Sequence, residues 1–320
     1  MRRLLLTCST LGLLAAPSLH AEELKVISTV KPVTMIVQEL TQGVTSTETL
    51  LPAGASPHDY ALRPSDARKL NEADLVIWVG PELERFLIKM LDGNENVLTL
   101  TAQDTIHFRH YGDAHDDHDE HKGHDHGHDD HDDHEGHDHA HDDHHGHSHD
   151  GIDPHLWLGP EQAIQAAQVI TEKLVSLDPS HKDKFEQNLA NFTKEVRAAV
   201  ASIEQTLAPV SDRGYFVFHD GYGYFEDQFG LNNLGHFTVE PDRRPGAKTL
   251  ISIRNALKDE HAKCVFSEPQ FSPAVVDSVV RGTGVNIGTL DPMGTDIAYG
   301  DGSYVEFLNQ LGQSFSQCLK

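Results

Sequence analysis

The chain has 320 residues, which is enough for two domains of ordinary size. It contains 50 acidic and 25 basic residues, giving a formal net charge of −25. This balance excludes a typical nucleic-acid-binding protein, because phosphate contacts need clustered Lys and Arg side chains.

The first 21 residues have the pattern of a cleaved signal peptide. Arg2 and Arg3 precede an apolar core over residues 4–16, and Ala21 ends a suitable cleavage site. A short membrane anchor is the alternative, but the apolar run is too short to cross a bilayer comfortably. We therefore predict an exported, soluble mature protein that begins after Ala21.

Short apolar runs alternate with helical patterns, both before and after the middle of the chain. The predicted strands are 24–29, 75–79, 97–100, 215–219, 264–266 and 286–290. The predicted helices are 32–40, 64–71, 82–91 and 251–258. This alternation predicts an α/β fold with parallel sheets in two lobes. The N-terminal lobe covers residues 22–112 and is completed by 151–179; the C-terminal lobe covers 208–320.

Residues 113–150 form an insert that is rich in histidine and acidic residues and has almost no apolar side chains. With so little to bury, the insert is expected to be disordered. Imidazole and carboxylate groups bind divalent metals, so we predict an accessory loop that collects, senses or buffers metal ions. A solvated spacer is the alternative. The fifteen histidines of this accessory metal loop are His115, His118, His121, His124, His126, His128, His131, His134, His137, His139, His141, His144, His145, His147 and His149.

Residues 180–207 carry one apolar stripe with spacings of three and four, which predicts a single long helix between the lobes. The stripe consists of Phe185, Leu189, Phe192, Val196, Val200, Ile203 and Leu207. At 1.5 Å per residue this helix would be roughly 40 Å long and would act as a stiff connection. A helical hairpin is the alternative, although no turn signal interrupts the segment.

Two cysteines, Cys264 and Cys318, remain after the signal peptide is removed. An even pair in an oxidising compartment favours a disulfide over two buried thiols. We therefore predict that this bond ties the C-terminus to a strand of the second lobe.

Three histidines outside the insert occupy positions typical of a ligand site. His58 lies in a turn-rich loop after an expected strand, His219 ends a predicted strand, and His155 precedes a helix. Open α/β sheets bind ligands beyond the carboxyl ends of their strands, and Asp291 also follows a strand. For each residue alone, a hydrogen-bonding or core role is the alternative.

Several of these segments together form a set of motifs. They are residues 51–60 (LPAGASPHDY), 64–66 (PSD), 73–76 (ADLV), 79–82 (VGPE), 153–158 (DPHLWL), 218–222 (FHDGY) and 290–292 (LDP). With the histidine-rich insert and the cysteine pair, the set resembles the metal-specific solute-binding proteins of ABC importers, and in particular their zinc-binding members. The resemblance extends over nearly all of the mature chain.

This resemblance implies two similar lobes joined by a rigid helix, with a metal in the cleft between them. It implies that His58, His155 and His219 bind Zn²⁺, because manganese-type relatives often place Glu where His219 stands. Some zinc members have an acidic residue where this chain has Pro57. The fourth ligand is therefore left open between Asp291 and water.

The same resemblance implies a monomeric periplasmic protein that captures Zn²⁺ and delivers it to an ABC-type permease and its ATPase, without catalysing a reaction. A zinc chaperone or store without a transporter and a manganese-type solute-binding protein are alternatives. A zinc hydrolase is another, since three histidines and a water also form a catalytic arrangement. It would need a general base such as Glu268 or Asp220, and the HExxH motif is absent.

Overall fold

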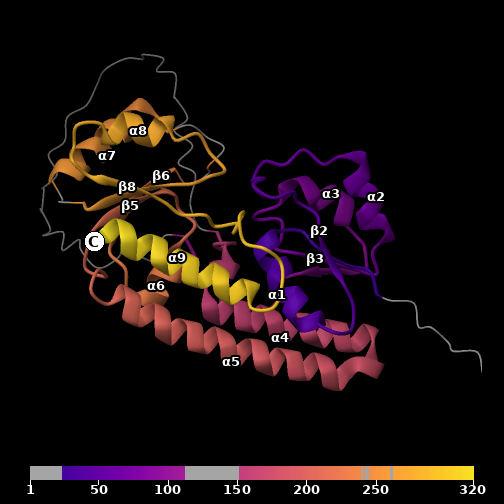
Figure 1. Ribbon diagram of the computed structural model, residues 1–320. Coiled ribbons are helices and arrows are strands. Elements are labelled where there is room, and N and C mark those ends of the chain that lie inside the picture. Colours follow the sequence, from indigo (N-terminus) through magenta and orange to yellow (C-terminus); the bar gives the residue numbers. More distant parts are fainter. Residues whose placement is uncertain (1–23, 112–150, 239–240, 242–244, 260–261) are drawn as a thin grey trace, which may run out of the picture.

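The computed structural model describes residues 24–111, 151–238, 241, 245–259 and 262–320. Two lobes lie side by side above a layer of long helices (Figure 1). The predicted signal peptide and the predicted accessory metal loop lie outside the described residues. Within the described residues, no helix is both long and apolar enough to cross a membrane.

The N-terminal lobe is built on a parallel sheet with the strand order β2-β1-β3-β4. Its strands are β1 (Val26–Ser28), β2 (Thr47–Thr49), β3 (Leu75–Trp78) and β4 (Val97–Thr99). The helices are α1 (Lys31–Thr41), α2 (Pro64–Glu72) and α3 (Ile88–Leu91), which follows the short 3₁₀ turn η1 (Arg85–Leu87). Both α1 and α2 have Pro in the first turn, where the missing N–H costs no helical hydrogen bond.

The C-terminal lobe repeats this arrangement with the order β6-β5-β7-β8, again fully parallel. Its strands are β5 (Tyr215–His219), β6 (Asn233–Thr238), β7 (Cys264–Ser267) and β8 (Asn286–Thr289). The helices are α6 (Gly223–Phe229), α7 (Ala247–Asp259) and α8 (Ala274–Val280). The predicted α/β class with two parallel sheets is therefore confirmed, although the predicted strand ranges include neither β2 nor β6.

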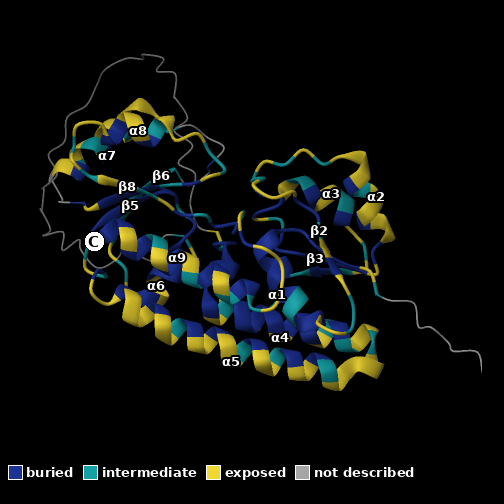
Figure 2. Ribbon diagram, in the orientation of Figure 1, coloured by how far each residue is buried: buried dark blue, intermediate teal, exposed yellow. Residues whose placement is uncertain are grey.

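Three long helices join the lobes: α4 (Pro160–Leu177), α5 (Lys182–Leu207) and α9 (Ser303–Leu319), with the 3₁₀ turns η2 (Leu156–Leu158) and η3 (Pro179–His181) before α4 and α5. The predicted single helix is confirmed as α5, an unbroken helix of 26 residues, so the hairpin alternative is wrong. Figure 2 shows buried residues along its inner face and exposed residues along the outer face. α5 packs against both α4 and α9, so the connection is a helical layer and not a lone rod.

One hydrophobic core runs through this layer into both lobes. It includes β1 and β3 of the N-terminal sheet, the buried stripe of α5, and Phe266 and Phe315 of the C-terminal lobe. A second, smaller core lies between the C-terminal sheet and the helices α7 and α8. Because the main core is shared, large independent movements of the lobes would expose apolar surface.

Cys264 and Cys318 form the predicted disulfide. The bond joins β7 to the last turn of α9, and both residues are buried. It therefore ties the end of the chain to the centre of the C-terminal sheet.

Candidate metal centre

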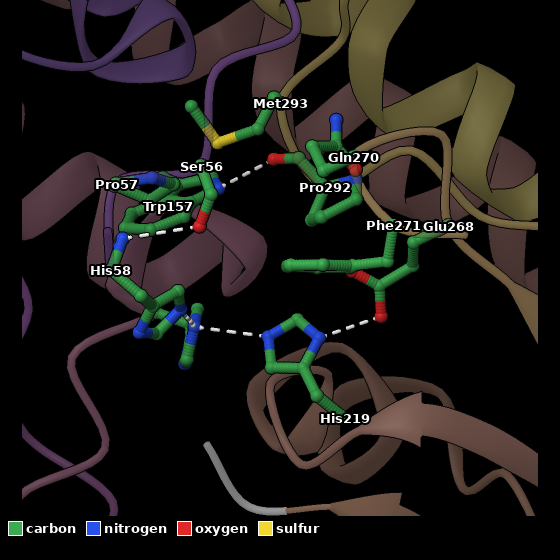
Figure 3. A pocket seen from close by; sticks show the side chains of 11 residues that line it. Ser56, Pro57, His58, Trp157, His219, Glu268, Gln270, Phe271, Pro292 and Met293 are labelled. Atoms are coloured by element: carbon green, nitrogen blue, oxygen red, sulfur yellow. Dashed lines mark hydrogen bonds and ion pairs between the residues drawn. The ribbon is translucent and has the colours of Figure 1, made fainter. Parts of the chain in front are cut away.

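Three histidines converge between the lobes, and Figure 3 labels two of them, His58 and His219. The Nε2 atom of His155 lies 3.3 Å from that of His58 and 3.2 Å from that of His219. One ring nitrogen from each residue lies within 4.8 Å of the others. His58 comes from the loop after β2 and His155 from the residue before η2, whereas His219 is the last residue of β5. The predicted residues are thus brought together at the carboxyl edges of the sheets.

Buried carboxylates orient two of the rings. The Nδ1 atom of His155 lies 2.8 Å from Oδ1 of Asp153, which also accepts the backbone N–H of His155. The Nδ1 atom of His219 lies 2.6 Å from Oε1 of Glu268. A carboxylate at Nδ1 holds the proton there, so the lone pair of Nε2 is free to bind a metal. His58 has no carboxylate partner among the described residues and is partly exposed.

The surroundings favour neutral imidazoles at two of the three positions. Burial lowers the pKa of His58 and of His155 well below the usual value, and the neighbouring histidines lower both further. Burial also lowers the pKa of His219, but the Glu268 carboxylate outweighs it, so that this pKa is raised. Burial raises the pKa of Asp153 to about 6, although the His155 N–H and the Arg109 guanidinium oppose this rise.

Asp291 does not lie in this group. Its Oδ1 accepts hydrogen bonds from Gln270 Nε2 at 2.7 Å and from the backbone N–H of Met293 at 3.0 Å. Its Oδ2 accepts the backbone N–H of Thr295 at 2.5 Å. The Asp291 carboxylate thus caps the turn that follows β8, and Asp291 is not among the residues that line the cavity.

A small cavity with room for about one water-sized group adjoins the histidines. Besides the three histidines, its lining includes Trp157, Glu268, Gln270, Phe271 and Pro292. Three imidazoles with one open position suit the tetrahedral coordination of Zn²⁺. The donors are uncharged nitrogens, which favour Zn²⁺ over harder ions such as Mn²⁺.

Glu268, Asp153 and Gln270 were not predicted as parts of a binding site. Glu268 was considered only as the base of a hydrolase, but its Oε1 is hydrogen-bonded to His219. Two features of the sequence could have indicated the two carboxylates. Asp153 stands two residues before His155, and Glu268 directly follows β7, at the same sheet edge as His219.

Replacing Glu268 with Gln is expected to lower metal affinity about 10- to 100-fold, the usual effect of losing a carboxylate behind a ligand histidine. The pKa of His219 should fall, because the carboxylate that raises it is removed. Zinc competition and an NMR titration of the metal-free protein would measure the two effects. Glu48→Gln, on an exposed carboxylate, is the control. Unchanged affinity in Glu268→Gln would contradict the orienting role.

Comparison with known proteins identifies the family. The family model described as "ZnuA: Zinc-uptake complex component A periplasmic" matches residues 26–318. The chain belongs to the ZnuA family. The high-affinity zinc uptake system protein ZnuA of Yersinia pestis is 45% identical over 313 residues, covering 97% of this chain and 95% of that protein. ZnuA of Haemophilus ducreyi is 46% identical over 294 residues, covering 92% and 93%.

Solved structures have the same fold. A crystal structure of ZnuA superposes with a TM-score of 0.73 at 21% identity, covering 93% of this chain and all of that chain. The Streptococcus pneumoniae AdcAII protein gives a TM-score of 0.72 at 20% identity, covering 92% and 98%. The predicted resemblance to metal-specific solute-binding proteins is therefore confirmed by membership of the ZnuA family and by this fold.

Proposed function

We propose that this chain captures Zn²⁺ in the periplasm and delivers it to an ABC-type permease and its ATPase. The observation that carries the proposal is the buried cluster of three histidines, two of them oriented by carboxylates. Relatives of nearly the same length are named high-affinity zinc uptake proteins, which supports zinc as the cargo. His58, His155 and His219 are the proposed ligands, with water in the fourth position.

The two lobes share the proposed ligands, so a bound ion links them. His58 and His155 belong to the N-terminal half of the chain, and His219 belongs to the C-terminal sheet. Direct contacts already cross between the halves: Trp157 Nε1 donates to Pro292 O at 2.8 Å, and Lys31 Nζ donates to Thr295 O at 2.8 Å. Little rearrangement is then needed on binding, and the ion adds a final cross-link that a permease can recognise.

A zinc hydrolase is the competing function, and the structure gives it less support. Glu268 is committed to His219, and Asp220 contributes its backbone carbonyl to Tyr111 and lies 3.7 Å from His236. Glu268 lines the cavity with one carboxylate oxygen held by His219, and Asp220 is not among the residues that line it. We infer that the protein does not catalyse hydrolysis, and an esterase and peptidase assay of the zinc-loaded protein would test this.

The deciding experiment removes residues 113–150 and measures zinc binding. We expect one tightly bound zinc ion to remain while the total number of zinc ions bound per chain falls, because the accessory histidines supply only weak sites.

A second experiment tests delivery. With the cognate permease in vesicles, the zinc-loaded protein should stimulate ATP hydrolysis. A zinc chaperone or store would bind the metal without this stimulation. Loss of the tight site on deletion would place the main function in the insert.

A further inference from the structure

The Asp291 carboxylate is held by donors that leave it poorly available to a metal. Three N–H groups, from Gln270, Met293 and Thr295, donate to its two oxygens. Nearby, the buried ammonium of Lys31 donates to the carbonyls of Thr295 and Ile297 in the same turn, at 2.8 and 2.6 Å. Moving Asp291 toward the histidines would break these hydrogen bonds and leave partly buried donors without acceptors.

Gln270 stands between this turn and the metal cavity. An ionised carboxylate only accepts hydrogen bonds, so the amide nitrogen of Gln270 must face Asp291 and the amide oxygen must face away. That oxygen, Oε1, is buried and has no hydrogen-bond partner among the described residues. Gln270 also lines the cavity that contains His58, His155 and His219, and Figure 3 shows it on the wall beside Pro292.

We propose that Gln270 is a specificity-determining residue of the metal site. Its amide N–H keeps Asp291 out of the coordination shell. Its Oε1 accepts a hydrogen bond from the water that completes the shell around the ion. This inference rests on the proposed zinc-binding function and deepens it, because it explains how the fourth position stays neutral.

A neutral shell has consequences for metal choice. Carboxylate oxygens favour harder ions such as Mn²⁺, whereas imidazole suits Zn²⁺. A site with three imidazoles and a water therefore discriminates against Mn²⁺ more strongly than one that also includes Asp291. Gln270 would provide this discrimination although it does not itself contact the metal.

The experiment compares Gln270→Met, Asp291→Asn and the double variant in the full chain. Gln270→Met keeps the bulk but removes both the donor and the acceptor. We expect it to lower the preference for Zn²⁺ over Mn²⁺ about tenfold or more, the size of effect typical of residues behind metal ligands. In spectra recorded with one equivalent of Co²⁺, the intense visible band of a four-coordinate site should weaken, because Asp291 would add to the shell as a fifth ligand. Asp291→Asn alone should change neither readout, and the double variant should return to the wild-type preference and spectrum.

Two outcomes would overturn the proposal. If Asp291→Asn alone weakened zinc binding about tenfold and altered the Co²⁺ spectrum, Asp291 would already be a ligand. If Gln270→Met left both the metal preference and the spectrum unchanged, Gln270 would not set the shell. A parallel His219→Ala variant separates a failure of the zinc site from a failure of the Gln270 proposal. If it retained tight zinc binding, the proposed zinc site itself would be wrong, whatever Gln270 does. The thermal unfolding temperature of each variant reports whether the substitution has destabilised the turn after β8.

Discussion

Replacing His58, His155 and His219 together with Ala is expected to abolish tight zinc binding in the protein lacking residues 113–150. Structural zinc sites provide about 10–16 kcal/mol from four ligands, or roughly 3 kcal/mol each, so His155→Ala alone should weaken binding about 100-fold or more. Competition with a zinc chelator of known affinity measures both changes.

His181→Ala is the matched control, because His181 is an exposed histidine paired with Asp178 and lies outside the converging group. It should bind zinc like the parent protein. The assignment of the three ligands fails if the triple variant keeps the parent affinity.

Removing the disulfide with Cys264→Ser and Cys318→Ser is expected to lower the free energy of unfolding by about 4 kcal/mol, because the unfolded chain gains the freedom of a long loop. The two cysteines are separated by 54 positions in the sequence, and Cys264 is fully buried. Urea unfolding of the oxidised parent and of the double variant gives the difference.

Reduction provides the control for this prediction. The parent protein treated with a thiol reductant should unfold at nearly the same urea concentration as the double variant, and the reductant should not affect the variant. A parent protein that is equally stable before and after complete reduction would contradict a stabilising role for the bond.

Much of the fold could be predicted because its signals are local. The run around Val76 is buried throughout β3, and the stripe from Phe185 to Leu207 has helical spacing along α5. β6 escaped prediction because Asn233 and Gly235 are poor strand formers and most of the strand is only partly buried. Its place is set by pairing with β5, which is a non-local interaction.

Placement near strand ends marked His58, His155 and His219 as candidates, and the resemblance to metal-specific solute-binding proteins predicted that they share one ion. The side chains that support these histidines and Asp291 were not predicted. Glu268 reaches His219 across 49 positions in the sequence, and Gln270 reaches Asp291 across 21. The place of Glu268 directly after β7 puts it at the sheet edge of His219, but which side chains pair there depends on side-chain directions in the packed lobe.

The three imidazoles are held in place to different degrees, and this difference affects how the ion leaves the site. His155 and His219 are each immobilised by a buried carboxylate, whereas His58 is partly exposed and stands on a loop with Pro57 beside it. The weakest restraint belongs to His58, so exchange of the ion should begin with detachment of this ligand. An acceptor protein that pulls on this one loop could then speed the departure of zinc while the shared core of the two lobes stays intact.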